Sequence, residues 1–171
     1  MRKSASQLDA VSLVNFINLT LEEKKMVLSW RNHPKTRRWM HNQDEIKLKD
    51  HLNFIQSLQS QKDKIYFLVK KEQEYIGVIS FTQLVTKKTV HMGIYSNPNT
   101  KGNGALLLSK IIDYSFSTLK VQKLFSEVFI ENKRAYTLYE SFGFTPISQK
   151  TVNSKTVICM EVDKDTLLTT K

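Results

Sequence analysis

A loop with two glycines that runs straight into a helical pattern is the feature that most limits how this chain can fold. The stretch "NPNTKGNGALLLSKIIDYSF" at 97–116 follows a strand-like run, and its apolar residues then recur at helical spacing. The first backbone N–H groups of a helix have no partner within the helix and attract negative charge. The loop is therefore either a tight turn or a site for an anionic ligand.

The order of the expected elements indicates the fold class. "VSLVNFINL" alternates like an edge strand, and Thr20 with Glu23 forms a capping-box pattern that opens a helix ended by Pro34. After these come a helix at 47–59, strands at 65–71, 74–84 and 89–96, a helix at 102–119, a strand at 123–131, a helix at 132–143, and the strands "FTPIS" and "TVICMEV". The order βααβββαβαββ predicts an α/β domain, 1–171, on a mixed, mostly antiparallel sheet of six to seven strands with about four helices.

Charge and composition restrict the partners. The 26 basic and 16 acidic residues leave a net charge of +10, which favours nucleic acid, phosphorylated cofactors or nucleotide-linked substrates. No apolar run is long enough to span a bilayer, and the N-terminus lacks the apolar centre of a signal peptide, so we expect a cytoplasmic protein without a membrane partner. The single cysteine, Cys159, is interpreted as a small buried hydrophobe, and no metal site is expected.

Two motifs, separated by the distance that is usual in the family, resemble those of the GCN5-related N-acetyltransferases. "NTKGNG" at 99–104 follows one expected strand, and "NKRAYTLYESFGF" at 132–144 follows the next. The resemblance covers most of the domain and implies the fold of that family, with acetyl-coenzyme A (acetyl-CoA) as cosubstrate. Phosphate binding then explains the glycines better than a turn does, because main-chain N–H groups would cradle the cofactor pyrophosphate.

The resemblance also implies which residues bind the cofactor. They are Ile94, Tyr95, Asn99, Lys101, Gly102, Asn103, Gly104, Ala105, Asn132 and Arg134. Gly102 and Gly104 would leave the phosphate path bare, and Lys101 would add charge. The family usually has Arg or Gln where Asn99 stands. The strand before the loop would splay from its neighbour and bind the pantetheine arm through backbone groups. Gly93 inside this strand is typical of a bulge or a close backbone approach, and a poorly packed edge strand is the alternative.

Catalytic groups follow from the same resemblance and from strand alternation. Tyr139 lies where the family has its general acid, and a phenol of pKa near ~10 can protonate a departing thiolate. On "KLFSEVFIE" the alternation groups Glu127 with Phe125 and Phe129, and apolar neighbours tend to raise the pKa of a carboxyl. Glu127 is the first candidate for the general base. His91, with a suitable intrinsic pKa, and water are the alternatives.

The acceptor is indicated by "WRNHPKTRRWM" at 30–40, which resembles family members that acetylate nucleotide-linked amino sugars in pseudaminic acid biosynthesis, a route to flagellin glycosylation. This implies the 4-amino group of UDP-4-amino-4,6-dideoxy-N-acetyl-β-L-altrosamine as the acceptor. Arg31 and His51 would bind phosphate, and Trp39 with Met40 would form an apolar wall for a deoxy-sugar or belong to the core. Similar runs occur in relatives that acetylate ribosomal-protein N-termini, spermidine or aminoglycosides.

Two other classes of protein remain as alternatives. A basic nucleic-acid-binding module would show aromatic and basic residues interleaved on exposed strands, or a groove-reading helix, and neither is evident. A cofactor-sensing domain of the same fold would bind acetyl-CoA without turnover. The favoured interpretation is an enzyme with a nucleotide-linked amino sugar and no nucleic acid as its partner, and a homodimer is compatible with it.

Overall fold

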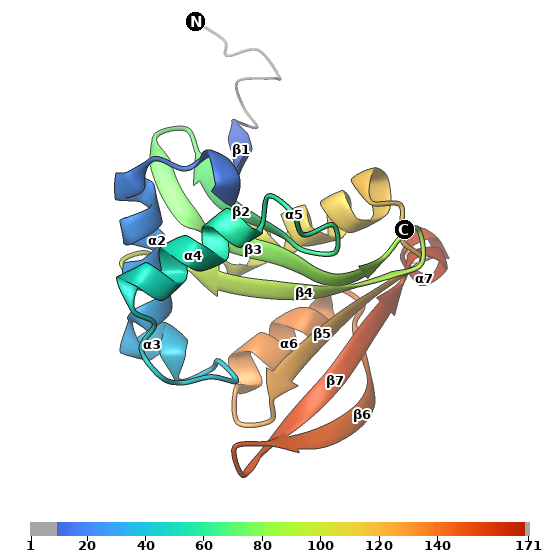
Figure 1. Cartoon of the computed structure of the whole chain (residues 1–171). Coiled ribbons are helices and arrows are strands. Elements are labelled where there is room, and N and C mark those ends of the chain that lie inside the picture. Colours follow the sequence, from blue (N-terminus) through green and yellow to red (C-terminus); the bar gives the residue numbers. More distant parts are fainter. Residues whose placement is uncertain (1–9, 170–171) are drawn as a thin grey trace, which may run out of the picture.

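A computed structural model describes residues 10–169 and places seven strands in one sheet, in the order β1-β2-β3-β4-β5-β7-β6 (Figure 1). The strands are β1 (Val11–Asn15), β2 (Ile65–Lys71), β3 (Glu74–Val85), β4 (Thr89–Ser96), β5 (Lys123–Phe129), β6 (Thr145–Val152) and β7 (Lys155–Asp163). Neighbouring strands are antiparallel except for β4 and β5, which are parallel. The predicted α/β class with a mixed, mostly antiparallel sheet is confirmed, and β1 is an edge strand as expected.

The helices agree with the predicted order and add short segments to it. They are α2 (Leu21–Asn32), α3 (Pro34–Arg37), α4 (Leu48–Ser57), α5 (Gly104–Asp113), α6 (Lys133–Ser141) and α7 (Lys164–Thr169), with a 3₁₀ turn at Phe16–Asn18 and a π-helical turn at Tyr114–Thr118. The capping box of Thr20 and Glu23 is present at the start of α2. Neither α3 nor α7 was predicted. Pro34, expected only to end a helix, is also the first residue of α3, where its missing N–H costs nothing.

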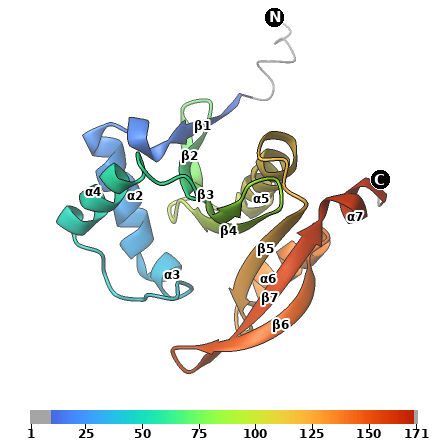
Figure 2. The same cartoon turned by 45° about the vertical axis from the view of Figure 1, so that its right-hand side comes forward.

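Helices cover both faces of the sheet (Figures 1 and 2). On one face α2 and α4 pack against β2 and β3 through a buried cluster that includes Val27, Trp30 and Ile55. On the other face α5 and α6 contribute Leu107, Ile111 and Tyr139 to the larger cluster. No helix within residues 10–169 is long and apolar enough to cross a membrane.

The two parallel strands, β4 and β5, diverge in the middle of the sheet. They pair only from Thr89 to His91 on β4, opposite Lys123 to Phe125 on β5. β4 nevertheless stays paired with β3 as far as Ser96, and β5 stays paired with β7 as far as Phe129. The edge of β4 that follows His91 and faces β5 therefore has no strand partner among the described residues (Figure 2). This is the splay that the family resemblance implied.

Gly93 lies on β4 just beyond the last residue paired with β5. A Cβ atom at Gly93 would stand 2.2 Å from the hydroxyl oxygen of Ser80, its partner on β3. The described register shift of this strand pair lies elsewhere, between Thr82 and Val85. A close approach is therefore present at Gly93, but the approaching group is a side chain of the neighbouring strand and not the backbone that the sequence suggested.

Candidate active site

The loop between β4 and α5 leaves the first turn of α5 without a side-chain cap. Asn103 is the N-cap residue, but its side chain donates to the Thr100 hydroxyl over 2.9 Å instead of accepting from the helix. Gly102 has a φ of +77°, which favours glycine, and a Cβ atom there would have nothing within 4 Å. The approach to the open N–H groups is thus free of side chains at Gly102, as an anion-binding loop requires.

Gly104 has a different reason to be a glycine. A Cβ atom at this first residue of α5 would lie 3.1 Å from the Cδ2 atom of Leu138 on α6. The missing side chain therefore lets the two helices approach each other, whereas the sequence suggested that it keeps the phosphate path bare. A valine at Gly104 would disturb helix packing, so it is a poor probe of ligand binding.

The other expected cofactor residues surround the starts of the same two helices. Asn132 caps α6 by accepting from the Ala135 N–H over 3.3 Å, so its oxygen is already used. Asn99, Lys101 and Arg134 are exposed. On β4, Ile94 packs against the core cluster that contains α5 and α6, and Tyr95 packs against the opposite one. The backbone of these two residues lies on the part of β4 that has left β5.

Tyr139 on α6 is buried, with 6% of its surface exposed, and its ring lies 5.7 Å from that of Phe144. Its hydroxyl makes no hydrogen bond to any residue in the described part of the chain. Burial raises the pKa of this phenol above its ordinary value, a departure from the unshifted group expected from the sequence. The hydroxyl therefore stays protonated at neutral pH, in the form that a proton donor needs.

Glu127 does not have the apolar surroundings that strand alternation suggested. Its Oε1 accepts from the Lys150 ammonium over 2.7 Å, and its Oε2 lies 3.2 Å from the His41 Nε2 atom. Lys150 comes from β6, and His41 comes from the loop after α3. Alternation describes only the strand's own neighbours, so these two contacts with distant segments could not be foreseen. The bond to Glu127 raises the pKa of the Lys150 ammonium.

His91, the rival candidate for the base, lies beside Glu127. Its ring is 5.1 Å from that of Phe125, its register partner on β5, and Phe125 and Glu127 point to the same face of that strand. Burial lowers the pKa of His91, and the charge of Glu127 opposes this effect. The next residue, Val128, points the other way and packs in the cluster that contains Tyr139. The candidate base and the candidate acid thus lie on opposite faces of β5.

Arg31 on α2 is only partly satisfied. Its Nη2 atom donates to the Asn42 carbonyl over 2.8 Å, and its Nη1 atom is buried without an acceptor. Burial lowers the pKa of Arg31, and the same cause raises the pKa of Tyr66 and of Tyr95, which lie near it. No carboxylate pairs with Arg31 among residues 10–169. Arg31 is thus a half-buried cation that lacks an anionic partner among the described residues.

The remaining expected acceptor residues have unlike environments. His51 is buried, and its Nε2 lies 2.8 Å from the Lys24 carbonyl, which joins α4 to α2. This contact occupies one of the two ring nitrogens and gives His51 a structural role, and the expected phosphate contact stays a prediction. Trp39 and Met40 are half-buried and belong to neither core cluster, so core packing is not their role. The Arg38 guanidinium lies 4.9 Å from the centre of the Trp39 ring.

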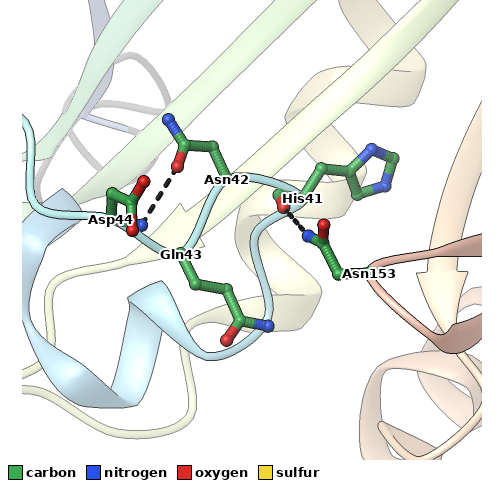
Figure 3. Close-up of a pocket in the computed structure, with 5 residues that line it drawn as sticks. All are labelled: His41, Asn42, Gln43, Asp44 and Asn153. Atoms are coloured by element: carbon green, nitrogen blue, oxygen red, sulfur yellow. Dashed lines mark hydrogen bonds between the residues drawn. The ribbon is translucent and has the colours of Figure 1, made fainter.

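A pocket of about 380 Å³ lies where the loop after α3 reaches the β6–β7 turn (Figure 3), and none of its lining residues was predicted from the sequence. They are His41, Asn42, Gln43, Asp44 and Asn153. The Asn153 side-chain amide donates to the His41 carbonyl across 112 residues of sequence. A contact this distant leaves no local signal in the sequence. The only hint is that "HNQD" at 41–44 directly follows the segment assigned to the acceptor. No group of three or more metal-ligating side chains occurs in the described ranges.

The diverging parallel strands, the open start of α5 and the tyrosine on α6 are the features that the resemblance to acetyltransferases implied, and comparison with known proteins agrees. The family model of the acetyltransferase (GNAT) domain matches residues 14–145. The chain therefore belongs to the GNAT acetyltransferase family and is an N-acetyltransferase.

Individual members of the family with known names or structures are similar to this chain. The chain is 38% identical over 135 residues to acetyltransferase PseH of Campylobacter jejuni. The aligned region covers 79% of this chain and 85% of the relative. The crystal structure of C. jejuni PseH in complex with acetyl coenzyme A matches with a TM-score of 0.75 and 30% identity, over 90% of this chain and 99% of that one. The crystal structure of a spermidine N-acetyltransferase from Vibrio cholerae, in complex with CoA and spermine, matches with a TM-score of 0.83 and 18% identity. The match covers 93% of this chain and 98% of that one, and at this identity it shows the shared fold alone.

Proposed function

We propose that this chain transfers the acetyl group of acetyl-CoA to the 4-amino group of UDP-4-amino-4,6-dideoxy-N-acetyl-β-L-altrosamine in pseudaminic acid biosynthesis. The similarity to PseH, at 38% identity over 79% of the chain, is the observation that carries the proposal. The net charge of +10 suits two phosphorylated substrates held together. A nucleotide sugar as substrate also favours a cytoplasmic, single-domain enzyme that works without a membrane or nucleic acid.

The cosubstrate would bind where β4, α5 and α6 meet. The uncapped first turn of α5 offers backbone N–H groups to the pyrophosphate, and Gly102 leaves their approach open. The unpaired edge of β4 after His91 would bind the pantetheine arm in the manner of an added strand. The thioester would then lie between the diverging strands, between Tyr139 on one face of β5 and Glu127 on the other.

The transfer needs one base and one acid. The free amine attacks the thioester carbon, a C–N bond forms, and the tetrahedral oxyanion collapses as the C–S bond breaks. Tyr139 would give its proton to the departing sulfur; like any phenol it is protonated at neutral pH, although the pKa that burial raises makes it a weaker acid than an exposed tyrosine. The proton lost by nitrogen would pass to Glu127, with His91 or water as the alternative acceptor. Metal chemistry is not required for these steps.

The acceptor would bind between α2, α3 and β5. The Nη1 donor of Arg31, which lacks an acceptor, fits a diphosphate oxygen. Trp39 and Met40, which lie outside the core, offer an apolar surface to the 6-deoxy position of the sugar. No strongly acidic run occurs that would hold a polyamine or an aminoglycoside.

A charge reversal at Lys101 tests the cofactor site. Lys101→Glu is expected to weaken acetyl-CoA binding by about 2- to 30-fold at low salt, because an exposed attraction is replaced by a repulsion of similar size. The loss shrinks at high salt. Titration calorimetry gives the Kd, and Lys88→Glu, the same charge change at the other end of β4, serves as the control. Equal affinity for the two variants would place the pyrophosphate elsewhere.

A panel of acceptors with acetyl-CoA tests the proposed substrate. The panel holds the UDP-linked amino sugar, the same sugar without its nucleotide, spermidine and a peptide with a free N-terminus. We expect the UDP-sugar to have the highest kcat/KM and the nucleotide-free sugar to lose about 10- to 150-fold, since a charge-assisted bond to phosphate contributes ~1.5–3 kcal/mol. Equal use of the free sugar, or preference for the peptide or spermidine, would refute the proposed acceptor.

A further inference from the structure

We infer that His41 and Lys150 are positioning residues for the Glu127 carboxylate, and that the contact of His41 with Glu127 ties the alignment of the base to the position of the acceptor loop, residues 38–46. The inference rests on the proposed function, in which Glu127 accepts the amine proton. It assigns roles to two residues that lie outside both family motifs.

Glu127 is held from two sides at once. The Lys150 Nζ atom is 2.7 Å from Oε1, and the His41 Nε2 atom is 3.2 Å from Oε2. The carboxylate side chain is 23% exposed, whereas that of His41 is 47% exposed. With both oxygens engaged, the rotation of the carboxylate is restricted.

His41 is itself fixed by two contacts that do not involve Glu127. Its carbonyl accepts from the Asn153 side chain at the β6–β7 turn (Figure 3), and its ring packs edge-on against Phe129 at 5.8 Å. Asn153 has a φ of +52°, which asparagine tolerates well. The acceptor loop is thus anchored on the hairpin that also supplies Lys150.

The groups that face Glu127 come from four segments. They are His41 from the acceptor loop, Lys150 from β6, His91 from β4 and Cys159, its register partner, from β7. Lys150 is positively charged throughout the working range of pH, whereas the His41 ring is charged only when protonated. The charge that Lys150 places beside the carboxylate is therefore constant over that range, whereas the charge of His41 depends on its protonation.

The pH profile of kcat/KM separates positioning from a merely structural role. The rate falls at low pH as the base takes up a proton, so losing a donor that favours the charged carboxylate moves this acid limb to higher pH. Lys150→Met and His41→Ala are each expected to move the limb upward and to lower kcat/KM at neutral pH about tenfold, less than the ~10² that a 1 Å misplacement costs. His41→Gln, which keeps an N–H donor at a similar reach, should restore most of the loss.

Matched variants control for charge and for loop anchoring. Lys155→Met removes a cation from the same hairpin, one that lies 5.9 Å from the Phe129 ring, and should leave the limb in place. Asn153→Gly keeps the turn but removes the anchor of the loop, so KM for the sugar should rise more than kcat falls. An acid limb unmoved in Lys150→Met and in both His41 variants would overturn the inference, and so would a limb moved equally by Lys155→Met.

The limb is measured with whichever acceptor of the panel the wild type turns over. A wild-type enzyme that ignores the UDP-sugar refutes the proposed substrate, while the shift of the limb with another amine still decides the role of His41 and Lys150. If Lys150→Met does not fold, Lys150→Arg is used. It retains the charge, so its limb should stay within the wild-type range, and a shift as large as that of His41→Ala would contradict the inference.

Discussion

Tyr139→Phe is expected to lower kcat by about 10²–10⁴-fold while the fold and the affinity for acetyl-CoA stay unchanged. The change removes a hydroxyl that makes no hydrogen bond to the described residues and keeps the ring that packs against Phe144. The loss should therefore appear in the chemical step. Single-turnover kinetics and calorimetry with acetyl-CoA separate this step from binding.

Tyr136→Phe, on the same helix, is the control for Tyr139→Phe. Tyr136 is half-buried at the edge of the same core cluster, so its variant should turn over at the wild-type rate. Because burial raises the pKa of Tyr139, its proton is retained above the ordinary range of a phenol, and kcat should not fall from loss of this proton below about pH 10. Wild-type turnover by Tyr139→Phe would mean that water or another group protonates the sulfur.

Arg31→Ala is expected to raise KM for the UDP-sugar by about 10- to 150-fold and to change KM for the nucleotide-free sugar little. A charge-assisted bond to phosphate contributes ~1.5–3 kcal/mol, and only the nucleotide-linked substrate carries the phosphate. Arg31 is the residue of α2 that we expect to bind the phosphate, because its Nη1 donor has no hydrogen-bond acceptor. Initial-rate kinetics with both sugars gives the two KM values.

Arg31 also holds the acceptor loop through the Asn42 carbonyl, so its removal has a second effect that needs a control. Arg37→Ala breaks another tie of this loop, the 3.6 Å ion pair with Glu45, and leaves Arg31 in place. Loosening of the loop alone would raise KM for both sugars in both variants. A rise confined to the UDP-sugar in Arg31→Ala assigns the effect to phosphate, and equal rises for both sugars would refute it.

Local patterns in the sequence were sufficient for the framework of the fold. Thr20 and Glu23 lie three residues apart and cap α2 as predicted, and Gly102 takes the positive φ that a glycine loop before a helix allows. Strand-like runs, two of them with clear alternation, indicated the seven strands, and the order of the elements indicated the sheet class. These features depend on neighbours within one or two turns of chain, so the residue order alone carries them.

The site depended on contacts that the order of residues does not record. Glu127 was assigned apolar surroundings from its own strand, but Lys150 and His41 reach it from segments 23 and 86 positions away. His51 was assigned to phosphate, but packing of α4 on α2 turns its ring to the Lys24 carbonyl. The sequence determined which elements form and which family they belong to, because helix caps, glycine turns and alternation act over a few residues. Only the tertiary structure decided which side chains face Glu127 and Arg31, because burial and charge pairing are set by whichever distant segments the sheet brings together.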